Sequence, residues 1–147
     1  MNLSYYNNFG IGVIALGAVL SHSKELPIPK LFLIFPLLSH KELLQYLGNK
    51  NTKIRSLEKL IVDKTSCFSN FNNRYTDSLI LTINALQYLH DMGYVNLIDG
   101  GVSLIKPFEY DEKMGVRAQQ FFNASARVAF ILKERSDNLY LNLRVEL

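Results

Sequence analysis

Residues 75–106 read YTDSLILTINALQYLHDMGYVNLIDGGVSLIK. In the first part of this stretch apolar residues recur at the spacing of one helix face, namely Leu79, Ile83, Leu86 and Leu89. That spacing predicts a helix over Tyr75–Met92, and Gly93 is the residue type that commonly ends a helix. Two short apolar segments then flank Asp99-Gly100-Gly101, which predicts a β-hairpin over residues 94–106.

A long helix followed directly by a hairpin is the order typical of a winged-helix unit, with residues 94–106 as the wing. A further helix is expected before it over Ile54–Lys64, where apolar residues again follow helical spacing. The polar segment Thr65–Asn73 between the two helices predicts a loop. We therefore assign the winged-helix-like unit to residues 52–106.

The preceding segment, residues 1–48, predicts apolar helices. Phe9–His22 is apolar nearly all round, as in a helix central to a core, and Asn7 and Asn8 are good N-cap residues for it. Leu26–Pro29 predicts an extended connector, because each proline disfavours helical backbone in the residue before it. Pro29 then suits the first position of a helix that continues to Leu38.

A third N-terminal helix is expected over Lys41–Leu47. Ser39 and Glu42 stand three residues apart ahead of it, which is the pattern of a capping box, and Gly48 would end the helix.

The remaining segment, residues 111–147, predicts a long helix and a tail. Apolar residues alternate by four and three over Lys113–Glu134. Residues 139–147 alternate apolar and polar, which favours a strand, but Ser136-Asp137 would equally cap a short helix. Both alternatives stay open. The fold class is thus mainly α with a small β-hairpin, in a single domain of residues 1–147.

Length and composition set limits on the function. The 147 residues are 48% hydrophobic and 20% charged, which excludes a mainly disordered chain, and Cys67 is the single cysteine. A chain of this length buries a core without disulfides or metal. The longest early apolar run, Phe9–Leu20, has twelve residues, whereas a membrane-spanning helix needs about twenty. We therefore expect a cytoplasmic protein with no membrane association.

The net charge of +3 is unevenly distributed. Residues 24–64 carry a net charge of +4 and residues 65–147 a net charge of −1. The densest basic group, a candidate nucleic-acid-binding cluster, is Lys50, Lys53, Arg55 and Lys59. A solvated helix face is the alternative interpretation. The helix before the wing offers Arg74, Asn84, Gln87 and His90 for contacts with bases. Asp77 and Asp91 offset them, so this helix is a poor reader of DNA.

Signals for enzyme chemistry are weak. Gly10–Ala15 matches the pattern of a dinucleotide-binding loop but follows a polar segment instead of a strand, so core packing is the better interpretation. Cys67 lies in a predicted loop without the sequence context of a nucleophile. We expect no catalytic residues, no cofactor and no metal site.

Apolar side chains on more than one face of the last long helix favour an interaction subunit. The candidate partner-interface residues on this helix and on the leucine-rich C-terminal end are Phe121, Phe122, Phe130, Leu139, Leu141 and Leu143.

Five segments in order carry a family resemblance. They are Tyr6–Gly12, the proline-flanked block Leu26–His40, Thr52–Leu57, Leu79–Lys106 and Leu141–Val145. With these segments the chain resembles the middle components of bacterial three-component ABC (SMC-like) ATPase systems, a group related to the Lamassu anti-phage systems.

The resemblance implies a non-catalytic adaptor in defence against phage or plasmid DNA. Its expected partners are an SMC/Rad50-like coiled-coil ATPase and an effector subunit, often a nuclease, and it would meet DNA through the complex. The alternative function is a stand-alone winged-helix DNA-binding regulator.

Overall fold

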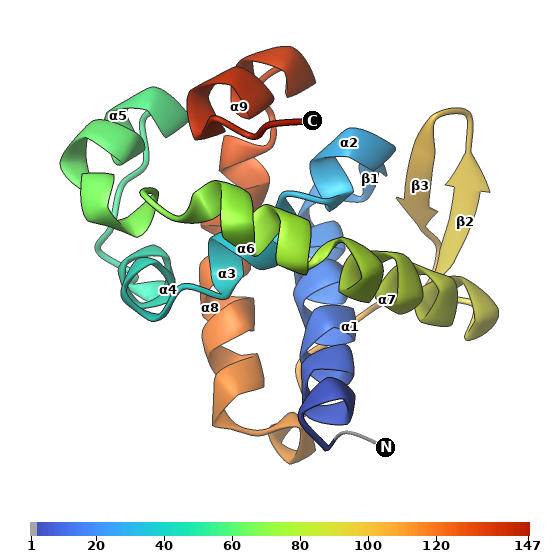
Figure 1. Ribbon diagram of the computed structural model, residues 1–147. Coiled ribbons are helices and arrows are strands. Elements are labelled where there is room, and N and C mark those ends of the chain that lie inside the picture. Colours follow the sequence, from blue (N-terminus) through green and yellow to red (C-terminus); the bar gives the residue numbers. More distant parts are fainter. Residues whose placement is uncertain (1–2) are drawn as a thin grey trace.

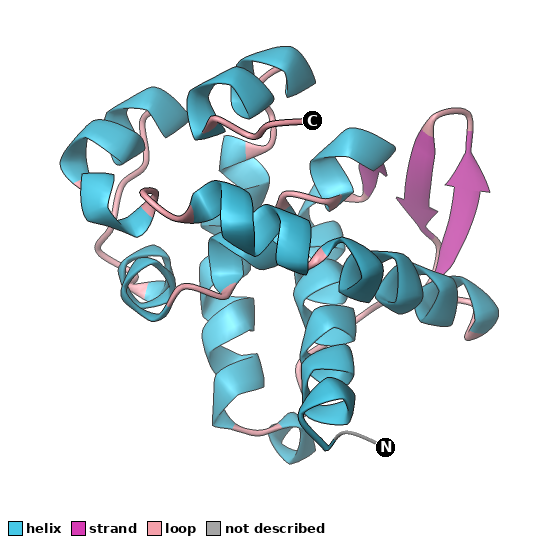
Figure 2. Cartoon of the chain, viewed as in Figure 1, coloured by secondary structure: helices cyan, strands magenta, loops and turns pink. Residues whose placement is uncertain are grey.

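Helices make up most of the chain, with one small sheet at its side (Figures 1 and 2). The computed structural model describes residues 3–147, and the side chains from residue 8 onward. The elements in chain order are α1 (Leu3–Ser23), β1 (Glu25–Pro27), α2 (Ile28–Leu31), α3 (Ile34–Leu38), α4 (Lys41–Gly48), α5 (Leu57–Asp63), η1 (Thr65–Cys67), α6 (Phe71–Asp77), α7 (Leu79–Asp91), β2 (Val95–Ile98), β3 (Gly101–Leu104), η2 (Glu112–Met114), α8 (Val116–Ile131) and α9 (Ser136–Leu143).

Helix α1 lies at the centre of the core, between α7 and α8. Its fully or nearly fully buried residues are Ala15, Leu16, Ala18, Val19 and Leu20. Small residues allow the neighbours to come close, because a side chain at Gly12 would meet Leu81 of α7 and one at Gly17 would meet the ring of Phe108. The first predicted helix is therefore present and central. It extends from Leu3, so Asn7 and Asn8 lie inside it instead of capping it.

The three strands form an antiparallel sheet in the order β1-β3-β2. The hairpin predicted over residues 94–106 is confirmed as β2 and β3, and Gly100 adopts a positive φ of 73° in its turn. The third strand, β1, comes from the predicted extended connector and places Leu26 opposite Val102. The sheet thus draws one of its strands from residues outside 52–106.

The helix predicted over Tyr75–Met92 is two helices, α6 and α7, separated at Ser78. The Ser78 hydroxyl donates to the carbonyl of Tyr75 at 3.1 Å, a local bond that competes with regular helix geometry. Of the predicted apolar stripe, Leu89 is buried and Leu79 and Leu86 pack against the core. Thr82 and Ala85 are also buried in α7. Ile83, assigned to the core stripe by its spacing, is exposed instead.

Other element boundaries differ from the sequence prediction. The run after Pro29 forms two short helices, α2 and α3, instead of one helix to Leu38. The cap of α4 is His40 and not Ser39, since His40 Nδ1 accepts a hydrogen bond from the Leu43 amide at 3.2 Å. The helix expected over Ile54–Lys64 is the shorter α5, capped by Ser56.

The predicted loop and the C-terminal segment also contain helices that the sequence prediction left out or bounded differently. Residues 65–73, predicted as a loop, include η1 and the start of α6. The long helix predicted over Lys113–Glu134 is the shorter α8, preceded by η2. Residues 136–143 are helix α9, which settles the open choice between strand and helix for most of this segment.

Candidate interaction surfaces

The four predicted nucleic-acid-binding residues are all exposed and lie on one segment, from the turn after α4 to the first turn of α5. Three of them, Lys53, Arg55 and Lys59, line one shallow hollow of about 70 Å³. Lys50 lies on the turn that precedes this hollow. The structure therefore brings the predicted cations together on one side of the α4–α5 connection.

This segment is held to α8 and to the turn after α8 by hydrogen bonds with two side chains, those of Arg127 and Glu134. Arg127 Nε donates to the carbonyl of Thr52 at 2.8 Å, and Arg127 Nη1 donates to that of Leu47 at 3.0 Å. Farther along, Glu134 Oε2 accepts from the amide of Leu57 at 2.8 Å. No local sequence pattern indicates these roles, because more than seventy residues separate the partners. The basic segment is consequently a fixed surface feature and not a free loop.

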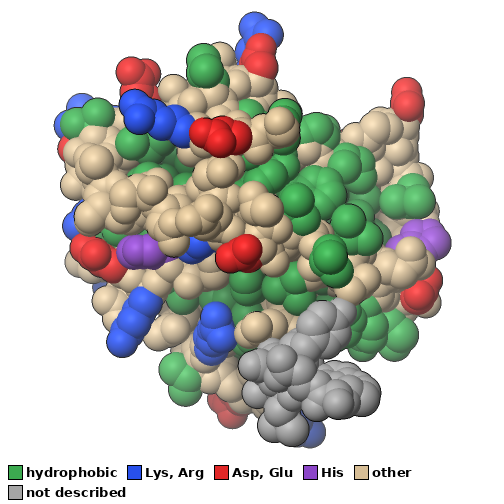
Figure 3. Space-filling model, viewed as in Figure 1, with side chains coloured by type: hydrophobic (Ala, Val, Ile, Leu, Met, Phe, Trp, Pro, Cys, Tyr) green, Lys and Arg blue, Asp and Glu red, His purple; other side chains and the backbone are tan. Residues whose placement is uncertain are grey.

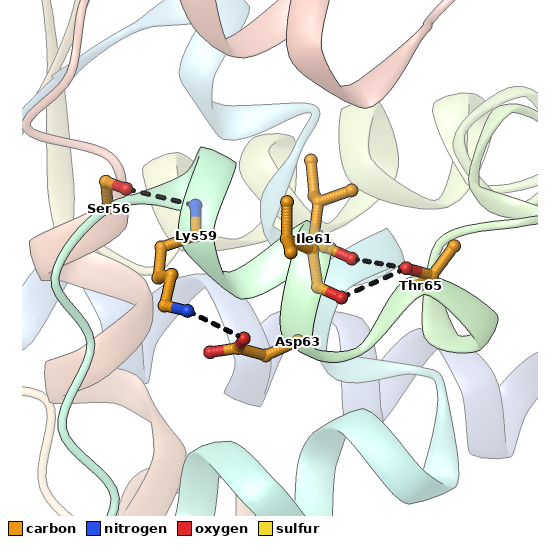
Figure 4. Close-up of polar contacts among 6 residues, drawn as sticks. Ser56, Lys59, Ile61, Asp63 and Thr65 are labelled. Carbon is orange, nitrogen blue, oxygen red and sulfur yellow. Dashed lines mark hydrogen bonds and ion pairs between the residues drawn. The ribbon is translucent and has the colours of Figure 1, made fainter.

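Local pairing reduces the positive charge of the hollow. Lys59 Nζ lies 3.0 Å from Asp63 Oδ1, one helical turn away, as Figure 4 shows. Lys64, the next cation, lies over the ring of Tyr46, 4.6 Å from its centroid. Lys50, Lys53 and Arg55 thus remain the main sources of positive potential here, a set suited to a few phosphate contacts.

If these cations contact phosphates within the assembled complex, the variant Lys53→Glu/Arg55→Glu should weaken duplex DNA binding by the complex. The slope of log K against log salt should also become shallower by about 2, since each lost phosphate contact removes about one released counterion. Binding measured across a salt titration checks both effects.

The matched control is Lys113→Glu/Lys133→Glu, which makes the same change in net charge at exposed sites elsewhere. It should leave the slope unchanged. An unchanged slope in Lys53→Glu/Arg55→Glu would show that these cations are solvated and do not contact phosphates.

The predicted partner-interface residues divide into buried and exposed sets. Phe121 and Leu139 are fully buried and Leu143 nearly so, which makes them core residues in this structure. Phe122 is half-buried and stacks on Phe108, with ring centroids 5.9 Å apart. The structure brings two of the six to the surface, Phe130 at 44% and Leu141 at 76% exposure. Helix α8 packs against both α1 and α4, and this explains why it is apolar on more than one face.

Leu141 forms part of a larger hollow that sequence reasoning did not identify. This hollow, of about 500 Å³, lies between α5, η1, α6 and the end of α9. Val62 of α5 is also exposed and lines it together with Leu141. Glu58 and Arg144 add one charge of each sign to the lining. We call this feature the α5–α9 hollow.

A second apolar surface covers the outer side of α7 and the hairpin. Ile80 and Ile83 of α7 are 69% and 53% exposed. Further exposed apolar side chains lie at the end of α7 and on the hairpin, namely Met92, Leu97, Ile98 and Ile105. Figure 3 shows apolar side chains gathered over this part of the molecule. We call it the α7–hairpin surface.

Of the polar residues considered for DNA reading, Arg74 lies on α6 and Asn84 and Gln87 lie on α7, and each has contacts within the chain. Arg74 Nε donates to the carbonyl of Pro36 at 3.1 Å, and its Nη2 donates to that of Cys67 at 2.9 Å. Gln87 Nε2 donates to Asp91 Oδ1 at 2.9 Å, and Asn84 is half-buried. From residue 79 to residue 104 the sequence contains no lysine or arginine. Residues 79–104 therefore supply no cation of their own for contacts with the DNA backbone.

Cys67, the candidate nucleophile, and His40 both have structural positions in the fold. Cys67 is fully buried, and this burial raises the pKa of its thiol, which disfavours the reactive thiolate. His40 uses Nδ1 to cap α4, and burial together with the Arg74 charge lowers the pKa of His40. Among the described residues, no three His, Cys, Asp or Glu side chains come close enough to hold a metal ion.

The part of the chain that the structure describes contains no helix with both the length and the apolar character to cross a membrane.

Comparison with known families identifies the chain. A family model described as ABC-three component (ABC-3C) system Middle Component 3 matches residues 16–147, from the middle of α1 to the C-terminal residue. The searches of curated proteins and of solved structures each found no match. The match confirms the resemblance to middle components inferred from the sequence. The chain belongs to the MC3 family, a family of middle components of ABC three-component systems.

Proposed function

We propose that this chain is a non-catalytic adaptor that links an SMC/Rad50-like ATPase to an effector subunit, in defence against phage or plasmid DNA. The observation that carries the proposal is the presence of two separate surfaces with exposed apolar side chains, the α5–α9 hollow and the α7–hairpin surface. The elements that form them, α5 with α9 and α7 with the β2–β3 hairpin, lie on different sides of the molecule (Figure 1). A subunit that holds two others needs two such surfaces.

General physical arguments support this proposal. Contiguous exposed apolar side chains commonly mark protein–protein contacts. Membership of a middle-component family implies other components for these surfaces to meet. The non-catalytic part of the proposal draws support from Cys67 and His40, whose positions serve packing and helix capping.

The finer features of the proposal concern fold type and setting. The elements that would form a winged helix are α1, β1, α7, β2 and β3, in that chain order. The position of β1 beside β3 in the sheet supports this arrangement. In that arrangement α7 takes the place of the recognition helix and residues 94–106 form the wing. A nuclease effector, a cytoplasmic location and a relation to Lamassu systems belong to the same proposal.

Co-purification tests the proposal. The tagged chain, expressed together with the products of the genes next to its own, should retain a coiled-coil ATPase and a second protein through size-exclusion chromatography. The control is the tagged chain expressed alone, which should elute without either. A chain that remains monomeric and unaccompanied in the presence of both candidates would overturn the adaptor role.

The alternative, a stand-alone DNA-binding regulator, is disfavoured by the charge of α7. Residues 79–104 carry Asp91 and Asp99 without any lysine or arginine. Tight, sequence-selective binding of duplex DNA by the chain alone at physiological salt would reverse this ranking.

A further inference from the structure

We propose that the α7–hairpin surface binds an amphipathic helix of another component, one whose apolar stripe is flanked by lysine or arginine. This inference rests on the proposed function and adds the chemistry of one partner. The structure supplies three arguments for it: the spacing of the exposed apolar residues, the sign of the surrounding charge, and the disposition of the acidic groups.

The spacing favours a helical occupant. Ile80 and Ile83 are three residues apart on the exposed side of α7, so they form a short apolar ridge along the helix axis. A partner helix packs its own apolar ridge beside such a ridge, as in ordinary helix–helix packing. Met92, directly after the end of α7, and Leu97 of β2 are also exposed apolar side chains.

The charge around this surface indicates which residues should flank the apolar stripe of the partner helix. Asp77 precedes α7, Asp91 ends it and Asp99 lies at the hairpin turn, and all three are exposed. No lysine or arginine occurs between residues 79 and 104, and Lys106, just beyond, lies over the ring of Tyr94 at 4.1 Å. An apolar surface with acidic groups at its margins is complementary to an apolar stripe with basic margins.

The same charges argue against two other occupants. A second copy of this chain would bring Asp77, Asp91 and Asp99 toward their equivalents, and like charges at an interface are unfavourable. Duplex DNA would place its phosphates against these three carboxylates, and like charges at an interface are unfavourable.

The test uses the full chain co-expressed with the other components of its system, and measures which of them co-purify. Ile83→Asp puts a charge on the apolar ridge at a position exposed enough to tolerate it, and should weaken binding of one component at least tenfold. The second component should remain bound. The matched control is Leu141→Asp in the α5–α9 hollow, which should retain the component that Ile83→Asp loses.

A charge reversal separates the possible occupants. Asp91→Lys should weaken binding of that same component several-fold, and the weakening should diminish at high salt. Circular dichroism of each variant checks that the chain keeps its helix content. Stronger binding of the component or of DNA by Asp91→Lys would overturn the inference in favour of an anionic occupant.

Two other results would also overturn it. Retention of both components by Ile83→Asp would remove the α7–hairpin surface as the docking site while leaving the adaptor role intact. A dimer of the chain alone that Ile83→Asp dissociates would assign the surface to a second copy. Absence of any complex with the unmodified chain would instead contradict the proposed function itself.

Discussion

Replacing Phe121 by alanine is expected to lower the free energy of unfolding by about 3–5 kcal/mol. Phe121 lies on α8, and its ring is among the largest fully buried side chains of the described residues. Removing it takes away its transfer free energy and leaves a cavity that the tightly packed helices α1 and α4 can only partly fill. Urea unfolding followed by circular dichroism measures the change.

Phe130→Ala is the matched control, because it removes the same atoms from the same helix. Phe130 is 44% exposed, so the loss of stability should be at most about 1 kcal/mol. Equal losses of stability in Phe121→Ala and Phe130→Ala would contradict the account, because the two rings would then be equally buried in the isolated chain. A Phe121→Ala variant that keeps its stability but loses its partners would restore Phe121 to an interface.

The second large effect is expected at Gly17, where any side chain would run into a fixed aromatic ring. A Cβ atom there would lie well inside van der Waals contact with Phe108. That ring cannot move away easily, because it stacks on Phe122 and meets Tyr94 edge-on at a centroid distance of 5.3 Å. Gly17→Ala should therefore cost about 1–3 kcal/mol of stability through overpacking.

Gly10→Ala provides the control on the same helix. A Cβ atom at Gly10 meets no described atom within 4 Å, so alanine should stabilise α1 by about 0.5–1 kcal/mol. Combining Gly17→Ala with Phe108→Leu should recover part of the loss, because a smaller side chain makes room for the methyl group. Additive losses in the double variant would show that Phe108 is not the source of the strain.

The elements that could be predicted from the sequence are those defined by local patterns. The hairpin follows from Asp99-Gly100-Gly101 between two apolar segments, and the central helix follows from an apolar run with small residues. The clustering of Lys53, Arg55 and Lys59 was also predictable, because these residues are neighbours in sequence.

Long-range contacts could not be read from local patterns. The pairing of Leu26 with Val102 creates the third strand, and no sequence pattern near Leu26 predicts this pairing. Arg127 reaches the carbonyls of Leu47 and Thr52 across the chain, so its role depends on how α8 packs against α4.

Apolar residues posed the same difficulty in assigning the interaction surfaces. Phe121 and Leu139 were predicted to face a partner because α8 and the C-terminal end have more apolar groups than one buried face requires. Helix α8 instead packs on two neighbours, which accounts for Phe121 within the chain. Ile83 shows the reverse, since its helical spacing indicated a core position and the structure exposes it.

A bridging experiment tests the adaptor role most directly. The ATPase component is tagged and expressed with the effector component, in the presence and in the absence of this chain, and the effector recovered with the tag is measured. We expect the effector to be recovered only when this chain is present. Equal recovery of the effector without this chain would contradict the adaptor role.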